Sequence, residues 1–279
     1  MRRDIWKRLT PLYEAGEAKA IVRWVLDVRF GLTMADILCG KVEEFSEADQ
    51  TELEAMMARL AEGEPVQYVL GVADFCGRQF RVAPGVLIPR PETAELCQWV
   101  IASLTSLPSP CEILDIGTGS GCIAVTLAAE MPAAQVTAWD ISDDALLIAQ
   151  ENAKTLGANV AFEKRDILDT SLPTSQTWDV IVSNPPYIMP SERDGMEENV
   201  LGHEPGLALF APADNPILFY QRIGDYAVHS LKSGGCLYFE LNPLTADDVA
   251  DDLRQRGFKD IEIRQDQYGK NRFLKAMKI

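Results

Sequence analysis

The stretch Asp115-Ile116-Gly117-Thr118-Gly119-Ser120-Gly121 decides the fold of this protein. Its first two residues end an expected strand at 112–116. Its last glycine begins an expected helix at 121–130, which ends before Pro132. Glycines let a backbone turn tightly and approach a ligand closely. A strand, a glycine turn and a helix in this order predict the ligand-binding turn of an α/β domain.

The spacing of the glycines indicates the kind of ligand. A dinucleotide fingerprint reads G-x-G-x-x-G, whereas this turn reads G-x-G-x-G and has Cys122 where the third glycine would stand. Asp115 adds a carboxylate able to meet a positive charge, and Asp140, at the end of the next expected strand, can accept hydrogen bonds from both ribose hydroxyls. The pattern suits a cofactor without a pyrophosphate. The alternative is a glycine turn that only packs the helix on the strand.

The turn resembles motif I of the class I methyltransferases, in which this loop wraps the methionine part of S-adenosylmethionine and the acid of the second strand binds the ribose. The resemblance also implies that the adenine lies near Arg165-Asp166-Ile167, so Asp166 or Ile167 is expected to contact it. A solvated acid in a turn is the alternative for Asp166. The expected cofactor-binding residues are Asp115, Gly117, Thr118, Gly119, Ser120, Gly121, Asp140, Ile167 and Asn184.

Beyond residue 93 the sequence alternates between strand and helix patterns. Strands are expected at 112–116, 135–139, 160–162, 179–183, 236–241, 260–264 and 272–277, and helices at 93–105, 121–130, 142–157, 215–232 and 245–256. This alternation predicts an α/β fold, a Rossmann-like class I methyltransferase domain whose seven-stranded sheet is mostly parallel with helices on both faces. The last two strands should pair antiparallel, and 188–214 is expected to be a mostly irregular loop that shapes the substrate channel.

The N-terminal third has a different pattern. Apolar residues recur at helical spacing, and Ser46 is a suitable N-cap, so a small helical domain is expected at 1–72, with partner recognition as its role. Short strands at 66–71 and 80–82, followed by a proline-rich segment, predict a β-hairpin linker at 73–92. The methyltransferase domain would then span 93–279.

The tetrapeptide Asn184-Pro185-Pro186-Tyr187 follows the expected strand 179–183, at the edge of the sheet where α/β domains bind ligands. A residue before proline avoids helical angles and the prolines lack N–H donors, so the Asn184 side-chain oxygen and the Pro185 carbonyl remain as fixed acceptors. Two such acceptors suit one NH₂ group, whose weakly nucleophilic nitrogen they would aim at a methyl group. The Tyr187 ring would lie beside the acceptor group or the sulfonium. The alternative is a proline-rich turn that ends a strand.

Both motifs, the linker Ile88-Pro89-Arg90-Pro91-Glu92-Thr93 and the helical N-terminal region together resemble the HemK/PrmC family of peptide chain release factor N5-glutamine methyltransferases, over essentially the whole chain. The resemblance implies methyl transfer from S-adenosylmethionine, giving S-adenosylhomocysteine, to the glutamine of the Gly-Gly-Gln motif in class 1 release factors. Where many members continue the linker with a second acid, this chain has Ala94, which affects a local contact.

The same resemblance implies roles for individual residues. The implied catalytic residues are Asn184, Pro185 and Tyr187, and the implied substrate-binding residues are Asn184, Pro185, Pro186, Tyr187 and Arg90. Pro89, Arg90 and Pro91 would border the cofactor or substrate channel. A salt bridge to a surface acid is the alternative for Arg90.

Charge separates the candidate functions. The chain has 26 Lys and Arg against 42 Asp and Glu, a formal net charge of −16. An adenine-N6 DNA methyltransferase shares the tetrapeptide but needs a basic groove, so it is disfavoured. A binding module that has lost catalysis is disfavoured because both motifs are intact, whereas another protein glutamine N-methyltransferase stays open. The acidic surface would suit a basic protein partner, or only keep the protein soluble.

Composition limits the remaining possibilities. Six scattered cysteines without a CxxC pair and only two histidines argue against a metal site. No apolar run is long enough to cross a bilayer and no signal peptide is evident. We expect a cytoplasmic monomer whose partners are class 1 release factors, with no direct contact to nucleic acid or membrane.

Overall fold

The computed structural model describes residues 4–104, 110–196 and 198–279. The chain forms two compact units. The smaller unit combines Met1–Val72 with Met196–His203, and the larger unit combines Ala73–Gly195 with Glu204–Ile279. Both sequence motifs therefore lie in the larger unit.

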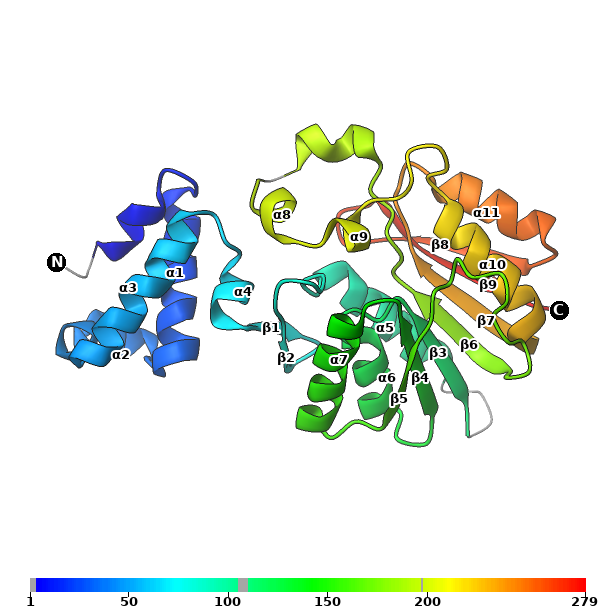
Figure 1. Cartoon of the computed structure of the whole chain (residues 1–279), viewed down its shortest axis with the longest axis horizontal. Helices are drawn as coiled ribbons and strands as arrows, with labels where there is room; N and C mark the ends of the chain where they lie inside the picture. Colours follow the sequence, from blue (N-terminus) through cyan, green and yellow to red (C-terminus); the bar gives the residue numbers. More distant parts are fainter. Residues whose placement is uncertain (1–3, 105–109, 197) are drawn as a thin grey trace. The chain divides into compact units, whose positions relative to one another are not determined.

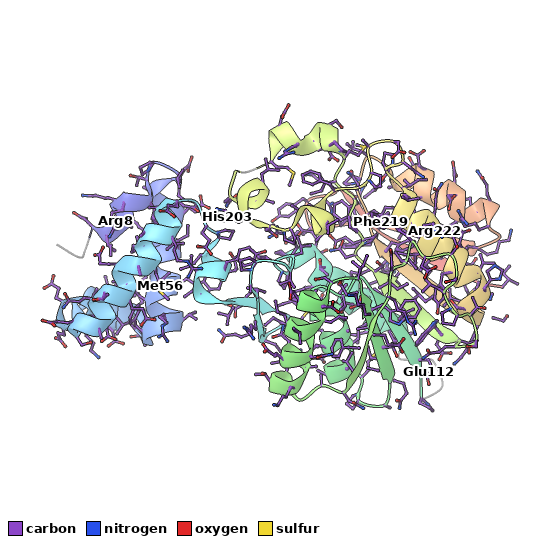
Figure 2. The ribbon with its side chains drawn as sticks, in the orientation of Figure 1. Arg8, Met56, Glu112, His203, Phe219 and Arg222 are labelled. Atoms are coloured by element: carbon purple, nitrogen blue, oxygen red, sulfur yellow. The ribbon has the colours of Figure 1, made fainter. Side chains whose placement is uncertain are left out.

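The smaller unit is a bundle of helices, as the N-terminal pattern predicted. Its helices before residue 72 are η1 Ile5–Leu9, α1 Ala15–Phe30, α2 Met34–Leu38, η2 Lys41–Glu44, α3 Glu47–Ala61 and α4 Val66–Leu70. Val25 of α1 and Met57 of α3 are fully buried in its core, beside Met56, which Figure 2 labels. Ser46 caps α3 as expected, because its Oγ atom accepts a hydrogen bond from the Asp49 N–H group at 3.1 Å.

The expected strand at 66–71 is wrong, because these residues form helix α4. Pro65 precedes the first turn, and Gly71 ends the helix in the left-handed region with φ 75°. A proline before a short apolar run and a glycine after it are typical helix boundaries. A run of five apolar-rich residues fits a strand or a helix equally well by periodicity, so these flanking residues were the better signal.

The expected hairpin is present as β1 (Val72–Phe75) and β2 (Arg78–Arg81). Asn152 of α7 (Asp143–Leu156) holds β2 in place, because its Oδ1 atom accepts from the Arg81 N–H group at 2.7 Å and its Nδ2 atom donates to the Arg81 carbonyl at 3.0 Å. The second Nδ2 hydrogen goes to the Ser120 carbonyl at 2.8 Å. One buried amide thus joins the hairpin to the glycine turn.

A seven-stranded, mostly parallel sheet forms the centre of the larger unit, as predicted. Its strands are β3 Glu112–Ile116, β4 Gln135–Asp140, β5 Val160–Lys164, β6 Trp178–Ser183, β7 Leu231–Glu240, β8 Lys259–Gln265 and β9 Asn271–Met277. The spatial order is β5-β4-β3-β6-β7-β9-β8, in which the first five strands are parallel and β9 is antiparallel to both of its neighbours. The expected antiparallel pairing of the last two strands is therefore confirmed.

Helices cover both faces of the sheet (Figure 1). One face carries α5 (Pro91–Leu104), α6 (Cys122–Glu130) and α7, and the other carries α10 (Leu218–Ser230) and α11 (Ala246–Gln255). The expected end of α5 at residue 105 lies outside the described residues. Most residues of β3 and β6 are buried, as expected for strands covered by helices on both faces.

The segment 188–214 is more helical than expected. It contains η3 (Pro190–Gly195), α8 (Glu198–His203) and α9 (Gly206–Leu209). Each of these helices is too short to produce a recognisable apolar repeat, which is why the sequence pattern missed them. Backbone bonds from Ile188 to Leu209 and from Ala211 to Ile188, both 2.9 Å, close the segment on itself.

Candidate active site

The carboxyl ends of neighbouring parallel strands bring the candidate residues together. Ile116, the last residue of β3, pairs with Trp139 of β4 and with Ser183 of β6, and Ser183 pairs with Phe239 of β7. The residues that follow these four positions are Gly117, Asp140, Asn184 and Glu240. The glycine turn and the tetrapeptide therefore lie side by side at one edge of the sheet.

The glycine turn has two parts with different surroundings. Gly117, Gly119 and Gly121 all have positive φ angles, of 75°, 54° and 80°, which side chains rarely adopt. A Cβ atom added to Gly117 or Gly119 would meet nothing within 4 Å, whereas one added to Gly121 would lie 2.9 Å from the Cβ atom of Ala149. The first two glycines therefore border open space, and the third packs α6 against α7.

Asp115 lies beneath this turn and is fully buried. Its Oδ2 atom accepts hydrogen bonds from the Thr118 hydroxyl at 2.6 Å and from the Ala124 N–H group at 3.2 Å. Its Oδ1 atom has no hydrogen-bond partner among the described residues. Burial raises the pKa of this carboxyl to about 7, against the two hydrogen bonds that lower it. A contact between Asp115 and a cofactor stays a prediction.

Asp140 stands beside the turn and is partly exposed. Its Oδ2 atom accepts from the Gly119 N–H group at 2.8 Å and its Oδ1 atom accepts from the Ser142 N–H group at 2.9 Å. A carboxylate oxygen has two acceptor sites, so each oxygen keeps one for a hydroxyl group. The two free acceptor sites suit a ribose diol, whose two hydroxyl groups would donate to them.

The segment expected near the adenine lies next to Asp140, because the Arg165 N–H group donates to the Asp140 carbonyl at 3.0 Å. Ile167 packs its side chain against the core on the α10 side of the sheet. Asp166 closes a local turn, since its Oδ1 atom accepts from the Leu168 N–H group at 2.8 Å. Asp166 therefore forms a turn, as its alternative role expected, and the contact of Asp166 or Ile167 with adenine stays a prediction.

The tetrapeptide is held by Thr93, the last residue of the linker motif, and by Glu240 and Asn242, which no sequence motif singled out. The Asn184 Nδ2 atom donates to the Thr93 hydroxyl at 3.2 Å, and that hydroxyl donates to Glu240 Oε2 at 2.6 Å. The Tyr187 hydroxyl donates to Glu240 Oε1 at 2.9 Å, and Asn242 Nδ2 donates to the Tyr187 carbonyl at 3.0 Å. Thr93 and Glu240 are buried, whereas Asn184 and Tyr187 are partly exposed. An acid directly after the apolar run 236–239 was the available sequence signal for Glu240.

Burial shifts the pKa values of both Glu240 and Tyr187. It raises the pKa of Glu240, while hydrogen bonds from Thr93 and Tyr187 and the charge of Arg272 act in the opposite direction. It also raises the pKa of the Tyr187 phenol well above its usual value, and the neighbouring Glu240 charge adds to the effect. Tyr187 is therefore a hydrogen-bond donor at neutral pH, with the Arg272 guanidinium 5.9 Å from its ring centre.

Arg90 forms the ion pair that we kept as its alternative role, although its partner is buried rather than on the surface. Its guanidinium lies 2.5 Å from Glu204 Oε1, and the Glu204 side chain is 1% exposed. Glu204 Oε2 also accepts from the Ile88 N–H group at 3.2 Å. The pair fastens the proline-rich linker to the segment before α9, and a contact of Arg90 with substrate stays a prediction.

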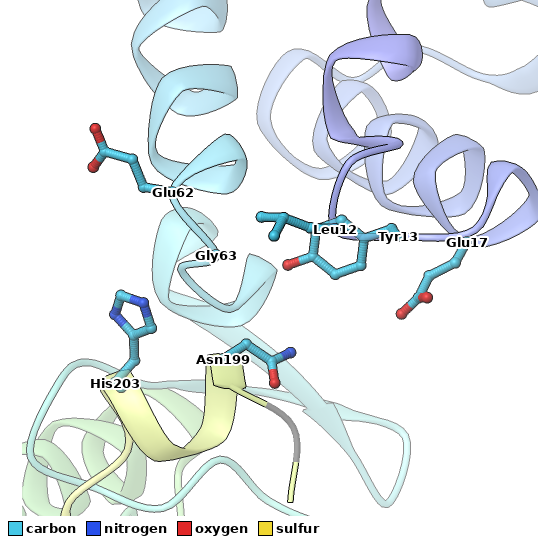
Figure 3. A pocket seen from close by; sticks show the side chains of 8 residues that line it. Leu12, Tyr13, Glu17, Glu62, Gly63, Asn199 and His203 are labelled. Atoms are coloured by element: carbon cyan, nitrogen blue, oxygen red, sulfur yellow. The ribbon is translucent and has the colours of Figure 1, made fainter.

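The smaller unit has a candidate feature of its own. A pocket of about 490 Å³ in the smaller unit is lined by residues that include Tyr13, Glu62 and His203 (Figure 3). In the part of the chain that the structure describes, no three His, Cys, Asp or Glu side chains are grouped to hold a metal ion. Nor do the described residues include a helix long and apolar enough to span a membrane.

Comparisons with known proteins match both the N-terminal helices and the α/β domain. Residues 7–71 match the PrmC N-terminal domain, and residues 99–201 match the methyltransferase small domain. The release factor glutamine methyltransferase of Bacteroides thetaiotaomicron is 43% identical over 98% of this chain and 97% of its own length. That of Flavobacterium psychrophilum is 36% identical over 99% and 97%.

A solved structure adds a comparison of fold. The Thermus thermophilus 16S rRNA N2 G1207 methyltransferase, in complex with AdoMet and guanosine, superposes with a TM-score of 0.54 at 19% identity. The alignment covers 75% of this chain and 50% of that one. At this identity the likeness concerns the fold, a class I methyltransferase domain.

Proposed function

The chain belongs to the release factor glutamine methyltransferases, and from this premise we propose that it methylates the side-chain amide nitrogen (N5) of the glutamine in the Gly-Gly-Gln motif of class 1 peptide chain release factors. S-adenosylmethionine would be the methyl donor. The main support for the proposal is the position of Asn184. It follows the last residue of β6, which pairs with the last residue of β3, so it lies beside the glycine turn that follows β3.

The residues at the glycine turn fit this donor. Gly117 and Gly119 border open space on their side-chain face, where a ligand could lie against the backbone. Asp140 keeps an acceptor site on each oxygen for a ribose diol. The unpartnered Oδ1 atom of buried Asp115 suits a hydrogen-bond donor or a positive charge. Ile167 would contribute apolar surface to the adenine side.

The chain's own residues would orient the acceptor. When bound, S-adenosylmethionine supplies an electrophilic methyl group on a sulfonium. Asn184 Oδ1 and the Pro185 carbonyl would accept the two N–H bonds of the glutamine amide and fix the direction of its nitrogen. Alignment of this kind contributes roughly 7–11 kcal/mol to lowering a barrier. No base has to act first, because the amide proton can leave after the methyl group has been transferred.

The remaining roles belong to the same proposal. The Tyr187 ring would lie beside the amide, and Pro186 would keep the turn rigid. Arg90 would border the substrate channel while paired with Glu204. The helical segment 1–72 would recognise the release factor, the hairpin 73–92 would link it to the methyltransferase domain at 93–279, and the protein would act as a cytoplasmic monomer.

Mass spectrometry of a release factor incubated with the enzyme and S-adenosylmethionine tests the proposal. We expect a gain of one methyl group on the Gly-Gly-Gln glutamine, lost in Asn184→Ala. Asn159→Ala is the matched control, because Asn159 is an exposed asparagine beyond the end of α7. Duplex DNA should stay unmethylated under the same conditions. Full activity of Asn184→Ala would refute the role of Asn184, and an unmodified glutamine with wild-type enzyme would refute the substrate.

A further inference from the structure

A chain of hydrogen bonds connects the two ends of the tetrapeptide to the buried carboxylate of Glu240. It runs from Asn184 through the Thr93 hydroxyl to Glu240, and from Tyr187 to the other oxygen of Glu240, with donor–acceptor distances of 3.2, 2.6 and 2.9 Å. Thr93 lies in the first turn of α5, and Glu240 is the last residue of β7. Three separate elements thus meet at the residues proposed to hold the substrate.

The direction of each bond in this chain is fixed by what Glu240 can do. The Thr93 hydroxyl donates to Glu240 Oε2 and the Tyr187 hydroxyl donates to Glu240 Oε1, so both hydroxyl hydrogens point at the Glu240 side chain. The Thr93 oxygen is then left with acceptor sites alone. The Asn184 amide must therefore turn its NH₂ group toward Thr93, and its Oδ1 atom is left to accept from a ligand.

The opposite orientation of the Asn184 amide would be unproductive. It would present an NH₂ group to the NH₂ group of a substrate, and two donors cannot form a hydrogen bond. It would also place the Asn184 oxygen against a Thr93 oxygen that has no hydrogen left to give. The threonine and the glutamate therefore select one of two amide orientations that are nearly equal in shape.

We propose that Thr93 and Glu240 are positioning residues for methyl transfer, which orient the Asn184 amide so that its oxygen accepts the substrate NH₂ group and hold the Tyr187 ring beside it. This rests on the proposed function. Neither residue touches the reacting atoms. Their effect should therefore appear in the rate of methyl transfer rather than in the binding of either substrate.

Thr93→Val and Thr93→Ser, made in the full chain, test the proposal. Valine keeps the shape of threonine and removes the hydroxyl, whereas serine keeps the hydroxyl. With a release factor and S-adenosylmethionine, we expect Thr93→Val to lower kcat about 10- to 100-fold, with KM for the release factor and Kd for S-adenosylmethionine within about threefold of wild type. We expect Thr93→Ser to keep kcat within about threefold of wild type.

A control separates this effect from the general loss of a buried hydroxyl. Thr126 of α6 is also buried and takes no part in this hydrogen-bonded chain, so Thr126→Val should leave kcat unchanged. Glu240→Gln is a second variant of unchanged shape, needed if Thr93→Val does not fold. A carboxamide has one acceptor oxygen and cannot accept both hydroxyl hydrogens at separate oxygens, so kcat should fall by a similar factor.

The outcomes distinguish this inference from the proposed function. A wild-type enzyme that leaves the glutamine unmodified would refute the proposed function itself. An active wild-type enzyme together with wild-type kcat in Thr93→Val or Glu240→Gln would overturn only the positioning role. An equal loss of kcat in Thr93→Ser and Thr93→Val would also overturn it, because the hydroxyl would then not be the group that matters.

Discussion

The carboxyl group of Asp115 has no access to solvent. Because of this burial, Asp115 should make the stability of the cofactor-free protein depend on pH. Its pKa is about 7 in the folded chain, against 3.8 for an unperturbed aspartate. The folded state therefore holds the proton more tightly than the unfolded state. The contribution of Asp115 to the free energy of unfolding is largest below about pH 4, decreases as pH rises and is lost above about pH 7.

Asp115→Asn should remove this pH dependence. Between about pH 5.5 and pH 8 we expect the stability of wild type relative to the variant to fall by about 2 kcal/mol, because asparagine has no proton to lose. Chemical denaturation at the two pH values measures the difference. Asp144→Asn, at an exposed position of α7, is the control and should follow wild type. An identical pH dependence in wild type and Asp115→Asn would contradict a buried, protonated Asp115.

Some site residues could be predicted from the sequence, whereas the contacts of others could not. Asp140 and Asn184 were predictable because each lies at the carboxyl end of a recognisable strand, where ligands bind in α/β domains. Thr93 and Glu240 are 147 residues apart, and the hydrogen bond between them exists only because α5 packs on the face of the sheet beside β7. No local pattern encodes such a pair. Arg90 illustrates the same limit, since its partner Glu204 lies in a segment that the sequence left irregular.

At the scale of elements, the glycine turn combines two tasks that a substitution can separate. Gly121→Ala would bring a methyl group to 2.9 Å from the Ala149 Cβ atom, in addition to a φ of 80°. We expect it to lower the free energy of unfolding by about 3 kcal/mol, because it adds a clash between α6 and α7 to the backbone strain. Denaturant unfolding of the cofactor-free protein measures this loss.

Gly119→Ala is the matched variant, because its methyl group would enter open space. Only the strain of its φ of 54° opposes folding, so the expected loss of stability is about 1 kcal/mol. The open space is where we propose that S-adenosylmethionine lies, so its Kd should rise at least about tenfold, which calorimetry would measure. Equal losses of stability in the two variants, or unchanged cofactor binding in Gly119→Ala, would contradict this division of tasks.

The elements that sequence patterns missed share a physical cause. Most residues of β3, β4 and β6 are buried. Their sequences are therefore rich in apolar residues and bounded by turns, and these strands were predictable. Helices α4, α8 and α9 have six residues or fewer. They are too short to complete the apolar repeat that identifies a helix, and tertiary contacts rather than local preference decide their conformation.

At the scale of the whole molecule, the division into units could be predicted only in part. The change from helical spacing to strand patterns near residue 70 reflects separate cores: one lies among the N-terminal helices, and two lie on the two faces of the sheet. The segment Met196–His203, however, groups with the N-terminal helices although it is far from them in sequence. Such a return of the chain depends on packing between distant residues and leaves no composition signal.

The net charge of −16 allows a last prediction about the whole molecule. If the acidic surface attracts a basic release factor, salt should screen that attraction and slow the encounter. We expect kcat/KM for the release factor to fall about 3- to 10-fold between about 50 and 300 mM NaCl, with Kd for S-adenosylmethionine changing much less. Sucrose at matched osmolality is the control, because it leaves charges unscreened. A kcat/KM that does not respond to salt would mean that the charge serves solubility alone, and that recognition depends on shape and hydrogen bonds.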